Sequence, residues 1–237
     1  RKNFSGIGKW DTSNVTDMEG LFFKMKDFNE DISAWNTSKV ENMISMFEDA
    51  DSFNRSLNNW DVSKVKSMKN MFRGAISFNQ ALNKWNVGEV MDMEEMFEAA
   101  YKFNQNINSW NVSKVKNMSY MFNSAKEFNQ PLDKWNVSSV EDMTCMFRYT
   151  KKFNQPLNSW NVSKVKYMEE MFYGTESFNQ NLNRWNVSKV KNMARMFCEA
   201  KKFNQDVSMW KVQGATDTVN MFLGSPLENR KPKWEGQ

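Results

Sequence analysis

The chain has 237 residues, of which 40% are hydrophobic and 25% are charged, as in one large globular domain or two small ones. Its formal net charge is +4, from 32 basic and 28 acidic residues, and this balance does not favour nucleic acid or an anionic membrane as a partner. The sequence contains no histidine, which excludes Ser-His-Asp and Cys-His catalysis and any zinc site built on histidine.

We expect no membrane-spanning segment and no signal peptide in this chain. No apolar run approaches the roughly 20 residues that span a bilayer, and no signal-peptide pattern is present. The sequence begins with Arg1 rather than Met, so we expect a processed or trimmed piece that has lost its targeting segment. The stretch NFSGIGK before Trp10 is expected to belong to an N-terminal cap or partial repeat over residues 1–9.

From Trp10 onward the sequence is a tandem repeat with a constant period. With tryptophan as position 1, the consensus is W-N-V-S-K-V-K-N-M-x-x-M-F-x-x-A-x-x-F-N-Q-x-L-N-x. Residues 10–209 hold eight repeats, and residues 210–237 hold a degenerate ninth repeat and C-terminal cap, where Ala215 and Thr218 replace Val and Met. The 25-residue spacing is unbroken at Trp10, Trp35, Trp60, Trp85, Trp110, Trp135, Trp160, Trp185 and Trp210.

The recurring apolar positions predict a core shared between repeats. They are positions 1, 3, 6, 9, 12, 13, 16, 19 and 23, and one 25-residue unit cannot bury them alone, so neighbouring units must stack. Methionine pairs such as Met118 and Met121 are therefore expected in the core rather than at a copper site. The asparagine at position 20 is expected to form a stacked amide ladder that satisfies backbone groups.

Within each unit the period of the pattern changes. W-N-V-S alternates apolar and polar residues and predicts a short strand at positions 1–4. The serine at position 4 and the apolar residues at 6, 9, 12, 13 and 16 predict a capped short helix or helical turns near positions 5–15. The predicted fold class is an α/β solenoid, with one short parallel strand and one short helix or helical turn per coil. Stacked strands about 4.8 Å apart are expected on the inner side of an arc.

The segment L-N-x-W-N-V-S-x-V resembles the leucine-rich-repeat signature L-x-x-L-x-L-x-x-N, with tryptophan in place of one leucine. The fuller string MFNSAKEFNQPLDKWNVSSVEDM resembles the short surface-protein repeat of mycoplasma-type lipoproteins and BspA-like bacterial surface proteins, with similar proteins in algae and large DNA viruses. The resemblance implies a leucine-rich-repeat-like solenoid on a surface, with a role in adhesion or recognition and without catalytic residues. The chain shows neither the lipobox cysteine nor the wall anchor of that family.

The polar residues at positions 2 and 4 are the first candidate binding face. Regular ladders on the outward face of the strands suit a polysaccharide or a long protein surface. The alternative is that serine only caps helices and asparagine only solvates the sheet. Position 2 supplies Asp11, Asn36, Asp61, Asn86, Asn111, Asn136, Asn161 and Asn186, and position 4 supplies Ser13, Ser38, Ser63, Ser113, Ser138, Ser163 and Ser188.

Lysines at positions 5 and 7 form a second candidate surface. Glu41, Glu89 and Glu141 interrupt this stripe. A mostly basic stripe attracts an acidic partner, and a solvated charged face is the alternative. Its lysines are Lys39, Lys64, Lys66, Lys114, Lys116, Lys164, Lys166, Lys189 and Lys191.

The remaining reactive side chains have structural interpretations. The pairs Glu94–Glu95 and Glu169–Glu170 are expected on an exposed, solvated face. Cys145 and Cys198 lie two coils apart, about 10 Å by strand spacing, which is beyond the reach of a disulfide, so two free thiols are expected. We expect no catalytic residue, no metal and no cofactor.

The sequence thus predicts a non-enzymatic, surface-displayed repeat module that recognises a protein or a polysaccharide. The alternative is a structural component of a viral capsid, an envelope or a cell-surface layer, held by lateral protein contacts. The expected location is a cell surface, the extracellular space or a virion surface. Neither nucleic acid nor direct membrane insertion is expected.

Overall fold

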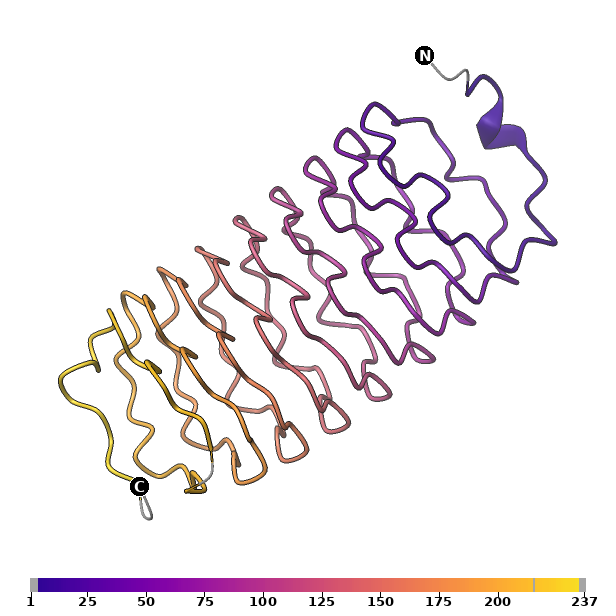
Figure 1. Cartoon of the computed structure of the whole chain (residues 1–237). Helices are drawn as coiled ribbons and strands as arrows, with labels where there is room; N and C mark the ends of the chain where they lie inside the picture. The colour runs from indigo at the N-terminus through magenta and orange to yellow at the C-terminus, as the bar shows by residue number, and fades with distance from the viewer. Residues whose placement is uncertain (1–3, 215, 235–237) are drawn as a thin grey trace.

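The computed structural model describes residues 4–214 and 216–234. Among these residues the only regular helix is the 3-10 helix η1 (Ile7–Lys9), and no helix is long and apolar enough to cross a membrane. The rest is a stack of 25-residue coils, which we number from coil 1 at Trp10 to coil 9 at Trp210, with the termini at opposite ends (Figure 1). The predicted replacement at Ala215, and the outermost residues of both predicted caps, lie outside the described residues.

The coils are joined by backbone hydrogen bonds along one side. At position 8 each coil forms an isolated parallel β-bridge with the next, from Asp17–Asn42 to Asn192–Asp217. Beyond this bridge, the N–H groups of positions 9, 11, 13 and 15 donate to the next coil, as Phe122 does to the Met146 carbonyl at 2.9 Å. The N–H groups between them close turns within their own coil. Along this segment, N–H groups that bond to the next coil thus alternate with N–H groups that bond within their own coil.

The predicted helix at positions 5–15 is wrong, because this segment is a run of tight turns. Positions 11 and 15 have a left-handed backbone in every coil, for example Glu95 (φ 55°), Tyr149 (φ 54°) and Gly174 (φ 64°). A type II turn requires such a residue at its third position, whereas a right-handed helix cannot contain it. Tandem turns and a helix both place positions 9, 12, 13 and 16 inward, so the apolar spacing alone does not separate them.

The predicted strand at positions 1–4 is also wrong. The parallel bridges lie at position 8, and among the described residues no backbone–backbone hydrogen bond joins positions 1–4 of one coil to the next. The rings of Trp110 and Trp135 have centroids 6.4 Å apart, compared with the roughly 4.8 Å between hydrogen-bonded strands. The predicted repeat protein is confirmed, but the described residues do not form the α/β elements of the predicted solenoid.

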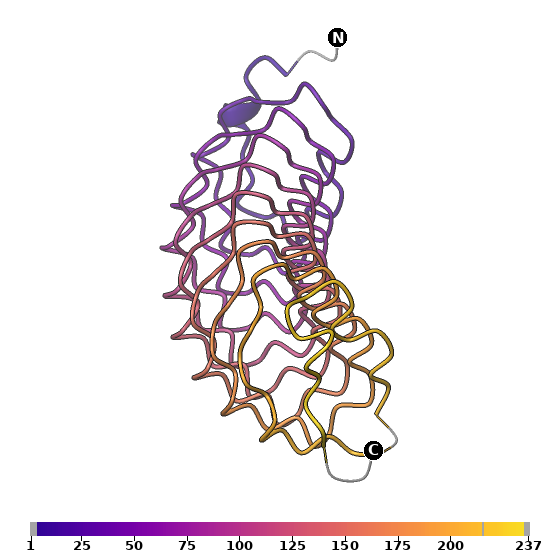
Figure 2. The ribbon, with the colours of Figure 1, turned by 90° about the vertical axis from the view of Figure 1, so that its left-hand side faces the viewer.

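The unequal spacing of the coils bends the stack into an arc (Figure 2). Ring centroids are 6.4 Å apart for Trp135 and Trp160, and 5.7 Å apart for Phe122 and Phe147. The coils are closest where their backbones are hydrogen-bonded, at about 4.8 Å. The bridges and tandem turns therefore lie on the concave side, and the tryptophans lie toward the convex side.

Stacked aromatic and methionine side chains fill the core. In coils 2–8 the residues at positions 9, 12, 13 and 16 are fully buried, with a solvent exposure of 0%. Within one coil, Phe122 and Phe128 stack with centroids 4.1 Å apart. Each indole from coil 2 to coil 9 also makes a hydrogen bond: Trp110 Nε1 donates to the Leu82 carbonyl at 2.9 Å, and this carbonyl also accepts the Trp85 N–H at 3.1 Å. Repetition of the bulky residues is therefore a packing requirement.

The predicted asparagine ladder at position 20 is confirmed. The Asn79 Oδ1 accepts the backbone N–H of Asn104 at 3.0 Å, and the Gln105 side-chain amide at 3.0 Å. The same bond from the position-20 N–H to the preceding asparagine repeats from Asn29 to Asn204. The amides thus supply the acceptors that a neighbouring backbone would supply in a sheet.

Candidate interaction surface

The predicted face is exposed at position 2 and half-buried at position 4, and the polar side chains of position 2 already have a structural role. In all eight coils from Asp11 to Asn186, the side-chain oxygen at position 2 accepts the backbone N–H of position 4 at 2.9–3.2 Å. These bonds are Asx turns, which end the extended run of W-N-V. No helix follows the serines among the described residues, so helix capping is not their role.

The basic stripe at positions 5 and 7 is mostly exposed and partly neutralised. Lys66, Lys114 and Lys166 form ion pairs with glutamates of the preceding coil, at 2.5, 2.7 and 2.5 Å. The Lys66 ammonium lowers the pKa of Glu41 by a hydrogen bond. Lys39 donates to Asn14 instead. Among the described residues, no ion pair involves Lys64, Lys116, Lys164, Lys189 or Lys191, so the unpaired charge of the stripe is greatest toward coils 7 and 8.

A third surface, which we call the variable face, consists of positions 10, 11, 14 and 15 on the concave side. Here the residue type changes from coil to coil, while the buried positions 9, 12 and 13 between them barely change. The left-handed backbone at positions 11 and 15 belongs to the turns that separate inward from outward side chains. The coils thus hold a row of variable side chains on an almost invariant scaffold.

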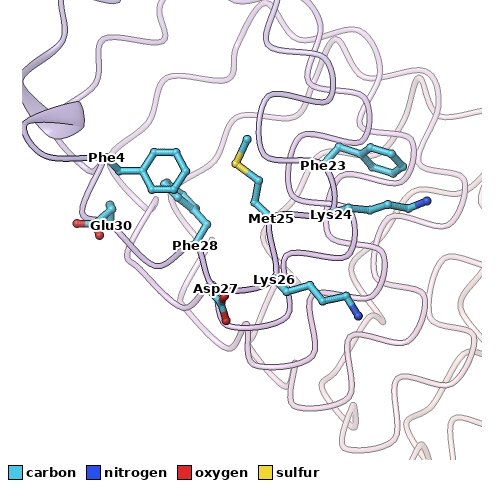
Figure 3. A pocket seen from close by; sticks show the side chains of 8 residues that line it. All are labelled: Phe4, Phe23, Lys24, Met25, Lys26, Asp27, Phe28 and Glu30. Carbon is cyan, nitrogen blue, oxygen red and sulfur yellow. The ribbon is translucent and has the colours of Figure 1, made fainter. Parts of the chain in front are cut away.

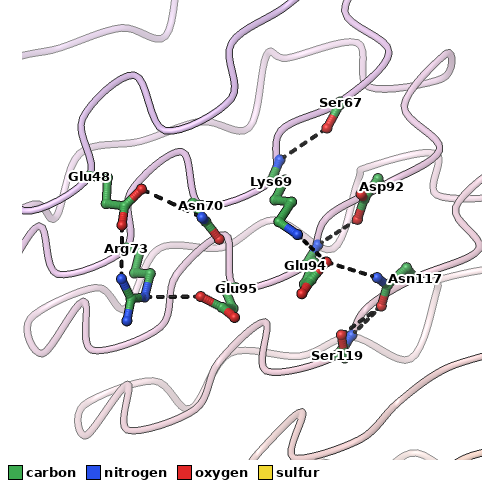
Figure 4. A network of polar contacts seen from close by, with 10 residues as sticks. All are labelled: Glu48, Ser67, Lys69, Asn70, Arg73, Asp92, Glu94, Glu95, Asn117 and Ser119. Atoms are coloured by element: carbon green, nitrogen blue, oxygen red, sulfur yellow. Dashed lines mark hydrogen bonds and ion pairs between the residues drawn. The ribbon is translucent and has the colours of Figure 1, made fainter. Parts of the chain in front are cut away.

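The variable face of coils 2–4 is an acidic network around one arginine (Figure 4). The Arg73 guanidinium contacts Glu48 at 2.8 Å, Glu95 at 3.0 Å and Glu98 at 2.9 Å. In the same network Lys69 contacts Glu94 at 2.7 Å. Because one guanidinium serves three carboxylates, they repel each other across it.

The electrostatics of this network are clearest at Glu95. Burial, together with repulsion from Glu98, raises the pKa of Glu95 to about 7. Its side chain is 24% exposed, and that of Glu94 is equally enclosed. The Glu170 side chain is 13% exposed and contacts two arginines. The expectation that these glutamates lie on a freely solvated face is therefore wrong.

The variable face of coils 5–8 carries three tyrosines, and its two arginines stand beside three glutamates. The Arg148 guanidinium lies over the rings of Tyr149 and Tyr173, at 4.7 and 5.5 Å from their centroids. The two rings meet edge to face at 5.2 Å, and Arg148 Nε lies 2.7 Å from Glu170. The Tyr149 ring covers Gly174, where an added Cβ would lie 2.5 Å from Cδ1 of that ring. These contacts hold both tyrosines in place.

Both cysteines are free, as predicted, and the structure shows that both are buried. Burial raises the pKa of the Cys145 thiol to about 12, so this thiol stays protonated and unreactive at neutral pH. Among the described residues, no group of three cysteine, aspartate or glutamate side chains is arranged to hold a metal ion. The cysteines therefore act as packing residues of the variable face.

A hollow lies at the N-terminal end of the stack. It has a volume of about 430 Å³, and its wall includes Phe4, Phe23, Met25 and Phe28 (Figure 3). Phe4 packs edge to face against Phe28 at 5.1 Å. Among the described residues no coil precedes coil 1, so side chains of the core columns reach the surface there.

Sequence reasoning missed Arg148, Tyr149 and Tyr173. They stand at positions 14 and 15, where the consensus has no preferred residue and therefore indicates no regular ladder. One signal could have drawn attention to them: glycine at position 15 in Gly74, Gly174 and Gly224 indicates a left-handed backbone rather than a helix. The variable positions flanking such glycines would then have been placed on an exposed turn.

These features define a tandem-repeat protein whose nearly invariant coils support one variable surface. The family described as "Mycoplasma protein of unknown function, DUF285" matches residues 1–100, 57–155, 79–177 and 131–234, and the chain belongs to this family. The predicted kinship with the mycoplasma-type repeat is thereby confirmed. A comparison with curated proteins gives no match, and a comparison with solved structures gives none either.

Proposed function

We propose that the chain is a non-enzymatic recognition module, displayed at a cell, extracellular or virion surface, that binds a protein through its variable face. One observation carries this proposal: four of the variable positions of the repeat, 10, 11, 14 and 15, stand together on one face, while the buried positions 9, 12, 13 and 16 between them repeat. Repeat proteins with such scaffolds offer extended concave surfaces for binding. Tyrosine and arginine, which occur together in coils 6 and 7, are enriched among energetically important interface residues.

The rigidity of the scaffold supports a binding role. Each side chain of the variable face stands between buried core positions and on a backbone that is hydrogen-bonded to the adjacent coil. A surface ordered in advance loses less conformational entropy when a partner binds. The variable face therefore meets the main physical requirement for recognition without large rearrangement.

A polysaccharide on the ladder of positions 2 and 4 is the less favoured ligand. The side-chain oxygens of that ladder already accept backbone N–H groups, so a sugar hydroxyl would compete with the turns. The ladder is also uniform, and uniformity offers little selectivity. A purely architectural role remains the competing function. It predicts lateral contacts with neighbouring proteins rather than a partner bound at the variable face.

Lysine crosslinking with mass spectrometry in the native source material tests the proposal. A recognition module should give crosslinks to a partner that depend on the variable face, and Tyr149→Ala should reduce them several-fold. The matched control is Tyr167→Ala, because Tyr167 is similarly exposed (40% against 36%) but stands at position 8. Stoichiometric crosslinks from Lys64, Lys114, Lys164 or Lys189 that Tyr149→Ala leaves unchanged would instead establish lateral, architectural contacts.

A further inference from the structure

The side chains at positions 14–18 of coils 6–8 form a distinct patch, which we call the tyrosine patch. It consists of residues 148–152, 173–177 and 198–202, and it encloses an open hollow of about 500 Å³. Tyr149 and Tyr173 line this hollow, and Gly174 lies between them without a side chain. Tyr149 is 36% exposed, so an entering group would meet its ring.

Cationic side chains dominate the tyrosine patch. It contains five of them and two carboxylates, and both carboxylates are already engaged: Glu176 with Lys151 at 2.7 Å, and Glu199 with Lys201. Carboxylates outside the patch hold Arg148 and Lys152. Lys202 is exposed and has no ion pair among the described residues. The five cations are Arg148, Lys151, Lys152, Lys201 and Lys202.

The equivalent rows of coils 2–4 have the opposite charge. Residues 48–52, 73–77 and 98–102 contain four carboxylates and two cations. These rows have the same backbone conformation, and they lie as far from the N-terminal end of the stack as the tyrosine patch lies from the C-terminal end. The difference in charge therefore comes from the side chains alone. A negatively charged partner is therefore attracted to coils 6–8 and repelled from coils 2–4. The carboxylates are Glu48, Asp49, Asp51 and Glu98, and the cations are Arg73 and Lys102.

We propose that the tyrosine patch binds an acidic polypeptide segment, which places an aromatic or aliphatic side chain in the hollow against Tyr149. This inference rests on the proposed recognition function and names the chemistry of its partner. Carboxylates of the segment pair with Lys202 and its neighbours, and the apolar side chain replaces water on the tyrosine rings. Arg148 holds both rings in place before binding, at 4.7 Å from the Tyr149 centroid.

The carboxylates of the patch favour a polypeptide over a nucleic acid. Glu176 and Glu199 line the hollow, where a continuous phosphate backbone would pass close to both. A polypeptide avoids this repulsion because it can alternate acidic side chains, which reach the lysines, with an apolar side chain, which reaches the hollow. The same surface therefore selects for interrupted rather than continuous negative charge.

Fluorescence anisotropy with the full chain tests this inference. The probe is a short dye-labelled peptide in which aspartate and glutamate flank a central phenylalanine. Lys202→Glu should weaken its binding about tenfold, and the matched control Lys102→Glu, at position 18 of coil 4, should leave it unchanged. Tyr149→Ala should weaken binding by a similar factor, while Tyr167→Ala should not. Replacing the central phenylalanine of the peptide with alanine should reproduce the Tyr149→Ala effect without altering the protein.

Three results would overturn the inference. The first is that a peptide with lysine in place of aspartate and glutamate binds as tightly as the acidic peptide. The second is that Lys202→Glu and Lys102→Glu change the binding of the acidic peptide equally. The third is that labelled single-stranded DNA binds more tightly than the peptide, which would assign the patch to nucleic acid. If crosslinking in the native material identifies a partner that depends on Tyr149 but the acidic peptide fails to bind, the recognition function stands and only the acidic partner is wrong.

Discussion

Asparagine and aspartate side chains shape most of the surface turns of this protein. At position 2 the Asn111 oxygen accepts the Ser113 N–H at 3.2 Å, and at position 8 the Asn117 oxygen accepts the Ser119 N–H at 2.9 Å. Each such bond replaces a backbone partner that the turn itself cannot provide. The regular polar ladders are therefore part of the scaffold, and the irregular positions between them are free to vary.

The first prediction concerns the ionisation of Glu95. Its pKa in the folded chain is about 7, which is above the ordinary value of a glutamate in an unfolded chain, so folding favours the protonated form. The resulting stabilisation is complete below the unfolded pKa and is lost as the pH rises through the folded pKa. Glu95→Gln should therefore match the native stability near pH 4 and exceed it near pH 8, by on the order of 1–3 kcal/mol.

Urea denaturation of both proteins across this pH range measures the difference. Glu30→Gln is the control, because Glu30 is exposed at the far end of the stack, and it should leave the pH profile unaltered. A stability difference for Glu95→Gln that does not change between pH 4 and pH 8 would show that Arg73 fully compensates the Glu95 carboxylate.

At the scale of the structural element, the tandem turn carries a repeated conformational cost. Among residues 4–214 and 216–234, fourteen residues other than glycine have a left-handed backbone, and Ala99 (φ 52°) is the one with the smallest side chain. A left-handed backbone costs a residue with a Cβ roughly 1–2 kcal/mol. The stack tolerates this cost because each such residue in coils 1–8 donates its N–H to the adjacent coil, as Ala99 does to the Asn123 carbonyl at 2.8 Å.

The second prediction follows from this cost. Ala99→Gly should raise the free energy of unfolding by about 0.5–1 kcal/mol, since relief of the left-handed strain exceeds the added entropy of the unfolded chain. The neighbouring variant Ala100→Gly is the matched control. Ala100 is fully buried and its φ is not positive, so its replacement should destabilise the protein by about 1 kcal/mol or more. Thermal or urea denaturation that gives both variants the same sign would contradict this account.

The sequence allowed the repeat, the core positions and the asparagine ladder to be predicted, because each depends only on a residue recurring above its own copy. Trp110, Phe122 and Asn104 illustrate this: each stacks on, or bonds to, its counterpart in the neighbouring coil. The conformation between these positions was not predictable in the same way. The spacing of the inward positions 9, 12, 13 and 16 fits a helix as well as tandem turns. Position 15 has a left-handed backbone, but in most coils it carries a residue other than glycine, such as Tyr149, so the sequence does not indicate that conformation.

The candidate surface was only partly predictable, for a related reason. The lysines of the basic stripe, such as Lys64 and Lys189, lie outside the core, as predicted. This prediction needs only the residue type, because lysine is rarely buried. The contact of Arg148 with Tyr149 and Tyr173 joins residues of adjacent coils, and its geometry depends on the turn conformation. Without that conformation, the variable positions could not be assembled into one face.

At the scale of the whole molecule, each coil contacts chiefly its immediate neighbours. The hydrogen bonds between coils join residues 22–28 positions apart in sequence, and the aromatic columns step by one coil at a time. Stability in such a chain is close to a sum of coil terms and nearest-neighbour terms. Removing one complete coil should therefore shorten the protein without destroying its architecture.

The third prediction tests this additivity. Deleting residues 110–134 joins Ser109 directly to Trp135 and keeps every column in register, so the product should fold cooperatively. Its urea m-value should fall by roughly a tenth, because m scales with the surface exposed on unfolding. Deleting residues 110–133 instead leaves Lys134 as an extra residue, and this control should lose cooperative folding. Equal behaviour of the two deletions in circular dichroism and urea denaturation would refute a register-dependent core.

The hydrogen bonds between coils also give the protein a net dipole along the axis of the stack. In a β-sheet the peptide dipoles of a strand alternate and nearly cancel. Here positions 9, 11, 13 and 15 all point their N–H groups toward the following coil, and fewer backbone N–H groups, chiefly those of positions 7 and 20, point back. The positive ends of these dipoles accumulate toward coil 9, where the Glu228 carboxylate accepts the Gly224 N–H at 2.9 Å. Each added coil extends this field along the stack, whatever residues its variable positions carry.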